Sequence, residues 1–394
     1  MAVFGSFRVP GTGALLDKGV AVYFEAPHSF TGEDVVEYHL HGGVAVVQGF
    51  LRVLSQQPEC RLAAPGEFTR RAFENGKIDL TAAEAVADLI DAETEAQRVQ
   101  ALDQLGGGLG RLYQDWAERL KKMLAHQEAE IEFPDEDMPD RISESLKPDV
   151  RKLIAEIGEH LNDGRRGERL RNGILIAILG APNAGKSSLL NALAQRDVAI
   201  VSEEAGTTRD IIEVHLDLGG YPVILADTAG LRATESKVEA EGIRRAEKLA
   251  GEADIKIALF DGTVSAADSA TLQMAQNDAL MVLTKADLPS KLRLDKAISI
   301  SSVTGVGIDV LLGTLTEKAA SLFGARKGPS LTRARHRAGL EQTRSALQRS
   351  LEAQLPELAA EDLRMALRSL GIMTGAVHVE DLLDTIFKDF CIGK

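Results

Sequence analysis

Few cysteines, few aromatic residues and no excess of basic charge characterise this chain. Its 394 residues include 2 cysteines, 1 tryptophan and 4% aromatic residues. Cys60 and Cys391 are too few for a disulfide framework, which predicts a reducing compartment, by default the cytoplasm. The net charge is −14, from 45 Lys and Arg against 59 Asp and Glu. This balance excludes a protein that binds nucleic acid through a wholly basic surface, so any such contact must use a local patch.

Long hydrophobic runs are also missing. No run approaches the roughly 18 apolar residues of a membrane helix, and glycines and a proline interrupt the apolar stretches of residues 1–24. The sequence therefore predicts a soluble protein with neither a signal peptide nor a membrane contact. At about 150 residues per domain, the length predicts two or three domains.

Changes of pattern along the chain predict four segments. They are residues 1–77, 78–172, 173–326 and 327–394. The first mixes short β-like runs with turn clusters, as in a small α/β domain. The second has leucines at helical spacing after a capping box formed by Thr81 and Glu84. The third alternates apolar runs with helical stretches, which is typical of an α/β domain with a mostly parallel sheet. The fourth is helical again, so the α/β domain is expected to be inserted into an all-α domain.

A glycine-rich turn follows the first apolar run of the third segment. Gly180-Ala-Pro-Asn-Ala-Gly-Lys-Ser187 lies between the strand-like Ile174–Leu179 and a helix-like stretch, which is the context of a P-loop. Its glycines let backbone N–H groups surround phosphates, Lys186 reaches the terminal pair, and the Ser187 hydroxyl ligates Mg²⁺. A plain glycine-rich turn is the alternative, and the motifs that follow argue against it.

Three later motifs fit a guanine-nucleotide site. Thr208, in a polar loop, can coordinate Mg²⁺ and sense the γ-phosphate, and Asp227-Thr-Ala-Gly230 places an acid beside the metal. Asp287 of Thr284-Lys-Ala-Asp287 can accept both N–H groups of the guanine edge, whereas adenine offers an acceptor there. GTP is therefore predicted over ATP. Ser301-Ser-Val303 ends the last apolar run.

Two positions depart from the usual GTPase pattern. Thr284 replaces the Asn that ties the base loop to the P-loop, which predicts weaker base affinity, and Thr284–Asp287 taken alone reads equally well as a surface loop. Leu231 stands where many small GTPases have a Gln that orients water. Leucine cannot orient water, so either the domain is a slow switch or another residue and another positive charge complete the site.

The motifs together resemble the MnmE (TrmE) family of tRNA-modification GTPases over nearly the whole chain. They are Phe30-Thr-Gly-Glu-Asp34, His41-Gly-Gly43, Pro65-Gly-Glu-Phe68, Pro182-Asn-Ala-Gly-Lys-Ser187, Gly206-Thr-Thr-Arg-Asp210 and Phe390-Cys-Ile-Gly-Lys394. The resemblance implies a P-loop GTPase domain inserted into a helical domain and preceded by a small α/β folate-binding-like domain. That first domain is expected to be truncated, because Met1 begins well inside the family pattern.

The resemblance also implies a potassium-activated GTPase domain that forms a homodimer. The K⁺ ligands it implies are Asn183, Ser202, Glu204 and Thr207. A cation near the β- and γ-phosphates can offset developing charge as an arginine finger does. The water-positioning acid falls on Glu239, with Glu241 as the adjacent rival, although a solvated helix face explains either carboxylate without the family. The predicted GTP contacts are Asn183, Ala184, Gly185, Lys186, Ser187, Ser188, Ser202, Thr207, Thr208, Asp227, Thr228, Ala229, Gly230, Thr284, Lys285, Asp287, Ser301, Ser302 and Val303.

The same resemblance implies chemistry on tRNA. It assigns a 5,10-methylene- or 5-formyl-tetrahydrofolate to Glu37, Lys77 and Lys394, which otherwise are ordinary surface charges. Cys391 is implied as a catalytic thiol, with a buried structural cysteine as the alternative. The implied partner is the FAD-dependent protein MnmG (GidA), in a heterotetramer that modifies C5 of the wobble uridine of certain tRNAs.

Alternatives remain open at this stage. A ribosome-assembly GTPase would need an RNA-binding module after the GTPase domain, and a GTP-gated, non-catalytic scaffold would bind GTP without turning it over. Two arginine-rich clusters, residues 165–171 and 333–337, could touch tRNA phosphates or form solvated helix faces.

Overall fold

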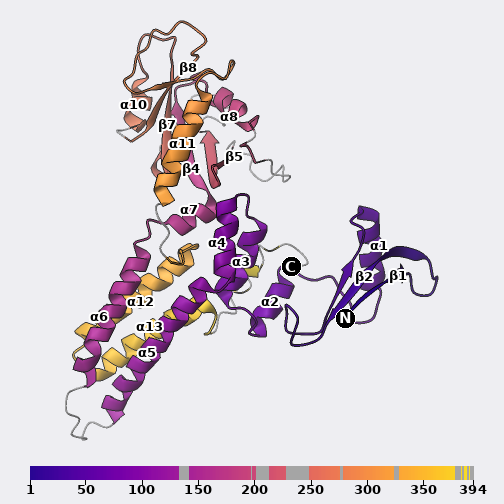
Figure 1. Ribbon diagram of the computed structural model, residues 1–394. Helices are drawn as coiled ribbons and strands as arrows, with labels where there is room; N and C mark the ends of the chain where they lie inside the picture. The colour runs from indigo at the N-terminus through magenta and orange to yellow at the C-terminus, as the bar shows by residue number, and fades with distance from the viewer. Residues whose placement is uncertain are drawn as a thin grey trace, which may run out of the picture. The chain divides into compact units, whose positions relative to one another are not determined.

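The computed structural model (Figure 1) forms two compact units. It describes residues 1–132, 142–196, 198–200, 213–227, 248–275, 278–323 and 328–377, together with Leu383, Ile386, Phe387 and Phe390. At residues 142–145, 213 and 227 it describes only the backbone. Unit 1 consists of Met1–Ile90, Asp103–Ala155 and Gly339–Lys394, and unit 2 of Asp91–Leu102 and Glu156–Ala338. The division of the chain into four segments, with boundaries after residues 77, 172 and 326, stays a prediction.

A three-stranded antiparallel sheet begins unit 1. Its elements and the helices that follow are β1 (Ala2–Arg8), β2 (Leu15–Phe24), β3 (Val35–His39), α1 (Val44–Ser55) and α2 (Glu67–Glu74). The strands lie in chain order, with Val20 opposite His39. Phe50 of α1 packs edge-on against Phe7 of β1 at 5.5 Å between ring centroids. This aromatic contact attaches α1 to the sheet, because edge-to-face rings gain both burial and quadrupole attraction.

Helices from distant parts of the sequence pack together in unit 1. They are α3 (Leu80–Ile90), α5 (Gly108–Glu132), the first part of α6 (Ile142–Leu161), most of α12 (Ala334–Glu352), and α13 (Pro356–Thr374). α5 and α13 run alongside each other (Figure 1), buried at Trp116 and Leu120 on α5 and at Leu363 and Leu370 on α13. The chain therefore returns to its first helical part after the α/β domain, which confirms the predicted insertion.

The start of α3 differs from the sequence prediction. Thr81 lies inside the helix, and Asp79 Oδ1 accepts hydrogen bonds from the Ala82 N–H at 2.8 Å and the Thr81 hydroxyl at 2.7 Å. Asp79 therefore caps the helix, and the capping box of Thr81 with Glu84 was wrong. The physical reason is that a carboxylate just before the first turn satisfies its free N–H groups as well as threonine does. Glu84 is buried instead.

Unit 2 is built on a six-stranded sheet. Its elements are α4 (Glu95–Leu105, whose last turn belongs to unit 1), α7 (Arg166–Asn172), β4 (Ile174–Gly180), α8 (Lys186–Ala194), β5 (Glu213–Leu218), β6 (Tyr221–Asp227), β7 (Ile255–Asp261), α10 (Ser269–Ala275), β8 (Leu280–Thr284), β9 (Ile298–Ser299) and α11 (Ile308–Phe323). The order is β5-β6-β4-β7-β8-β9, and all neighbours are parallel except β5 with β6. The alternating apolar runs correctly predicted this sheet.

The core of unit 2 is aliphatic. Ile176 and Ile178 of β4 and Ile257 of β7 are fully buried against Leu189 of α8 and Leu315 of α11. Parallel strands covered on both faces require such continuous apolar runs. No helix of the described residues is long and apolar enough to cross a membrane.

Candidate functional site

The phosphate loop joins the carboxyl end of β4 to α8. Asn183 and Gly185 both adopt the left-handed backbone conformation, with φ of 63° and 98°. Asparagine tolerates this conformation and glycine favours it. A Cβ on Gly180 would lie 2.9 Å from the Leu259 carbonyl oxygen, so glycine is required where β4 approaches β7. Because α8 begins at Lys186, its unsatisfied N–H groups lie at the loop, where they can bind phosphate.

Lys186 spans the beginning of this loop. Its side chain is buried, and Nζ donates hydrogen bonds to the carbonyl oxygens of Gly180 at 2.6 Å and Ala181 at 2.9 Å. These bonds place the ammonium group inside the turn rather than in solvent. A fixed positive charge at this position suits the terminal phosphates of a nucleotide.

Thr284 connects the base loop to the phosphate loop. The residue is 3% exposed, and its hydroxyl donates to the carbonyl oxygen of Ala184 at 2.7 Å and lies 3.2 Å from that of Phe260. The methyl-bearing side chain also lines Gly185, where an added Cβ would be 3.5 Å from Thr284 Cγ2. The threonine therefore makes the connection between the two loops that its sequence position predicts for asparagine.

The remaining base-loop residues are fixed by hydrogen bonds. The buried Ser301 hydroxyl donates to Asp287 Oδ1 at 2.6 Å, which orients the carboxylate predicted to read guanine. Lys285 has a φ of 61°, and its Nζ lies 2.5 Å from Asp261 Oδ2. Burial alone would raise the pKa of Asp261, but hydrogen bonds from Lys285 and Thr263 outweigh it and lower the pKa. Lys285 thus has a carboxylate partner at every pH near neutrality.

The structure brings together one group of the predicted GTP contacts. This group is Asn183, Ala184, Gly185, Lys186, Ser187, Ser188, Thr284, Lys285, Asp287, Ser301, Ser302 and Val303, at the carboxyl ends of β4, β8 and β9. The backbone of Asp227 pairs with Ile178 at the end of β6. Other predicted site residues lie outside the described part of the chain: Ser202, Glu204, Thr207, Thr208, Thr228, Ala229, Gly230, Leu231, Glu239, Glu241, Cys391 and Lys394.

The predicted folate contacts in unit 1 have separate partners. Glu37 of β3 lies 3.4 Å from His39, and Lys77 Nζ donates to the Pro27 carbonyl oxygen at 2.8 Å. No hydrogen bond or ion pair joins Glu37 to Lys77 within the described residues. Their role stays a prediction.

The arginines that flank the sheet of unit 2 bind neighbouring elements. Arg169 Nε donates to Asp254 Oδ1 at 2.6 Å, at the start of β7. Arg337 donates to Asp163 at 2.7 Å and to Glu168 at 2.9 Å. A solvated face is therefore wrong for these two side chains, because ion pairs occupy their guanidinium groups. Their acidic partners lie 85 to 174 residues away in the sequence, so no local pattern marked these pairs. A contact between the two arginine-rich clusters and tRNA stays a prediction.

This fold and site define a class of protein. The sheet is mostly parallel, a phosphate loop follows β4, and a base loop carries Thr284 and Asp287. These features define the GTP-binding domain of a P-loop GTPase, which is here inserted into a helical domain. Residues 80–391 match the family model for the MnmE helical domain, and residues 1–77 match that for the GTP-binding protein TrmE N-terminus. The chain belongs to the MnmE family of tRNA modification GTPases.

Curated relatives agree over nearly the full length. A tRNA modification GTPase MnmE of Parvibaculum lavamentivorans is 56% identical, covering 100% of this chain and 90% of that protein. The MnmE of Paramagnetospirillum magneticum is 53% identical, covering 98% of this chain and 88% of that protein. A crystal structure of Era from Aquifex aeolicus has 25% identity and a TM-score of 0.30, covering 46% of this chain and 69% of that chain.

Proposed function

We propose that this chain hydrolyses GTP to GDP and phosphate in a potassium-activated reaction and uses that cycle to modify tRNA. The observation that carries the proposal is the hydrogen bond from Thr284 to Ala184, which joins a base loop carrying Asp287 to a phosphate loop carrying Lys186. Family membership supports the same activity. Magnesium and potassium, when bound, supply positive charge beside the β- and γ-phosphates.

The residues of the phosphate loop fit these ions. Ser187, in the first turn of α8, and Thr208 offer the hydroxyl oxygens that Mg²⁺ prefers. Asn183 is exposed at the loop, and its side-chain oxygen suits K⁺, with Ser202, Glu204 and Thr207 as further ligands. Lys186 neutralises phosphate charge directly. Glu239 orients the attacking water, since Leu231 cannot.

The cation requirement tests this assignment. GTP turnover by the full chain should be much faster in KCl than in NaCl, and Asn183→Ala should remove the difference while leaving GDP binding largely unchanged. Asn162→Ala, at an exposed asparagine before α7, is the matched control and should keep the potassium response. Equal wild-type rates in the two salts would reject potassium activation.

The water-positioning acid needs its own comparison. Glu239→Ala should slow hydrolysis without weakening nucleotide affinity, as expected of a group that acts in the transition state. Glu241→Ala should have little effect. If Glu241→Ala were the damaging change, the assignment would pass to that residue.

The tRNA chemistry is proposed for the two units together. A homodimer acts in the cytoplasm with an FAD-dependent MnmG (GidA) partner in a heterotetramer. It adds an aminomethyl-type group at C5 of the wobble uridine, using Cys391 and a one-carbon tetrahydrofolate bound by Glu37, Lys77 and Lys394. The match of residues 1–77 to the TrmE N-terminus supports this part. Reconstitution with partner, tRNA and folate tests it, because a chain that does not support modification there would refute it.

A further inference from the structure

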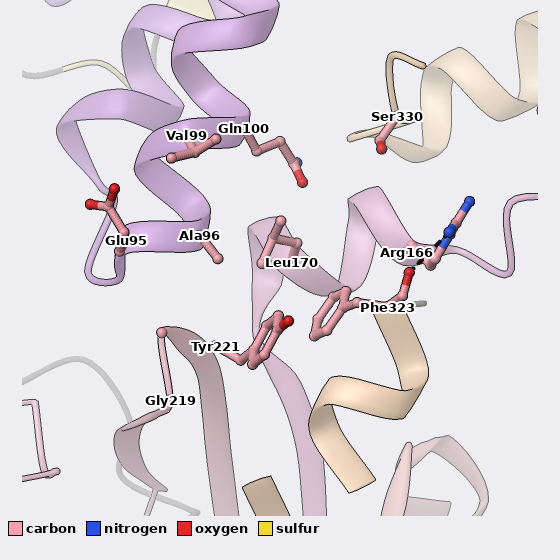
Figure 2. Close-up of a pocket in the computed structure, with 11 residues that line it drawn as sticks. Glu95, Ala96, Val99, Gln100, Arg166, Leu170, Gly219, Tyr221, Phe323 and Ser330 are labelled. Carbon is pink, nitrogen blue, oxygen red and sulfur yellow. Dashed lines mark hydrogen bonds between the residues drawn. The ribbon is translucent and has the colours of Figure 1, made fainter. Parts of the chain in front are cut away.

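A cavity of about 330 Å³ lies in unit 2, away from the phosphate loop (Figure 2). Its walls come from α4, from α7, from the turn between β5 and β6, and from the end of α11. α7 precedes the first residue of β4, Ile174, whereas the phosphate loop follows the last, Gly180. The cavity and the GTP site therefore lie at opposite ends of the same strand.

A pair of stacked aromatic rings forms part of the wall of this cavity. Tyr221 and Phe323 lie beside each other (Figure 2). They stack with 4.7 Å between ring centroids and 6° between ring planes. Leu170 of α7 and Val99 of α4 add apolar surface. A planar ligand would gain dispersion contacts and burial on such a wall. The volume is at the lower end of the range of small-molecule pockets, which suits two or three fused rings.

Gln100 places a polar side chain in the wall of the cavity. Its Nε2 donates to the Gly167 carbonyl oxygen at 3.1 Å, so the orientation of the amide is fixed and Oε1 is the remaining acceptor. The residue is 9% exposed, and Figure 2 shows its side chain extending from α4 into the space bounded by Leu170 and Ser330. No hydrogen bond to Oε1 occurs within the described residues. A ligand N–H can therefore bind there.

The charged side chains at the cavity have partners of their own. Arg166 donates to the carbonyl oxygens of Asp163 and Phe323, both at 2.9 Å, and Glu95 pairs with Arg98 at 2.6 Å. Much of the remaining lining is apolar, at Ala96, Val99 and Leu170, so a charged ligand would lose hydration there. The chemistry of the site thus favours an uncharged occupant.

We propose that this cavity binds a planar, uncharged heteroaromatic small molecule, packed against the side of the stacked Tyr221–Phe323 pair that faces the cavity and donating an N–H to Gln100 Oε1. The site is independent of the nucleotide site, and its occupancy fastens α4 to α7.

Indole and 1-methylindole are the matched probes, because they differ in the N–H donor. In the full chain with ¹³C-labelled methyl groups, indole should shift the resonances of Ala96, Val99 and Leu170 saturably, and that of Leu120 in unit 1 should not move. 1-Methylindole should bind about fivefold more weakly, since one hydrogen bond is worth about 1 kcal/mol. Equal affinity of the two probes would overturn the assignment of Gln100.

Two variants on α4 separate this cavity from other apolar surfaces. Val99→Trp fills the cavity and should abolish the indole shifts at Ala96 and Leu170. Leu102→Trp is the control, because Leu102 is similarly exposed on the same helix but does not line the cavity. Saturable shifts that persist in Val99→Trp, or that are absent from the wild-type chain, would refute the site. Neither result depends on GTP hydrolysis or tRNA modification.

Discussion

Thr284 shows how one side chain can join two loops of a nucleotide site. Its hydroxyl bonds the Ala184 carbonyl oxygen inside a buried environment, so Thr284→Val keeps the shape and leaves that acceptor without its donor. The expected loss of GDP affinity is about 1–2 kcal/mol, roughly tenfold. Titration with a fluorescent GDP analogue measures it. Thr284→Ser retains the hydroxyl and should bind within a factor of about three of wild type, and an equal loss in both variants would contradict this role.

At the residue scale, local motifs could be predicted from the sequence more readily than the hydrogen-bond partners of individual side chains. The glycines of the phosphate loop follow from local spacing, because neighbouring residues set the turn. That Thr284 itself keeps the connection to the phosphate loop could not be predicted in the same way, since its partner Ala184 lies 100 residues earlier and comes close only when β4 and β8 join one sheet. The start of α3 shows the limit of local prediction, because Asp79 and Thr81, two residues apart, could each cap the helix and the sequence does not rank them.

Arg337 connects three elements near α7. Its side chain is 14% exposed, and its guanidinium group donates hydrogen bonds to Asp163, Glu168 and the Leu161 carbonyl oxygen. Removing one partner of a mostly buried ion pair leaves charge without compensation. Arg337→Ala should therefore lower the free energy of unfolding by about 2–4 kcal/mol, measured by urea denaturation followed by circular dichroism.

The control for Arg337 is an exposed arginine with similar partners. Arg364 pairs with Glu128 and Glu361 and is 49% exposed, so Arg364→Ala should cost less than about 1 kcal/mol. Similar losses in the two variants would mean that burial does not set the strength of the Arg337 bonds.

His160, at the end of α6, should make stability depend on pH. Burial lowers its pKa from 6.5 to about 4, and Arg337 and His336 add to the shift against the opposing charge of Asp163. The unfolded chain therefore takes up a proton at a higher pH than the folded chain does. The contribution of neutral His160 to the free energy of unfolding is fully present above about pH 6.5. It falls by up to about 3 kcal/mol as the pH drops from 6.5 through 4.

Two histidine variants test that dependence. His160→Gln removes the titrating group, so the fall in unfolding free energy between pH 6.5 and 4 should be smaller than in wild type. His126→Gln, at an exposed position on α5, should leave the wild-type slope unchanged. Identical slopes in wild type and His160→Gln would disprove the assignment.

At the element scale, the sequence predicted the first strand of unit 2 within one residue, as Ile174–Leu179 against the observed β4. Apolar runs bounded by turn residues are required by a sheet covered on both faces, so the pattern is strong. The role of α7 could not be predicted, because its arginines read as surface charge until Asp254 and Arg337 are placed beside them. Charge pairs between distant segments leave no periodic signal.

For the whole molecule, the proposed chemistry is divided between the units. Asn183 belongs to unit 2 and Cys391 to unit 1, so the two functions should be separable by substitution. Cys391→Ser keeps the size but loses a readily ionised thiol, because a serine hydroxyl stays protonated at neutral pH. GTP turnover should remain at the wild-type rate, while tRNA modification in the reconstituted reaction falls by at least tenfold. Asn183→Ala should reduce both rates, because the chemistry on tRNA depends on the GTP cycle.

Cys60→Ser, at an exposed cysteine, is the control and should modify tRNA normally. A Cys391→Ser chain that modifies tRNA at the wild-type rate would make this thiol a packing residue.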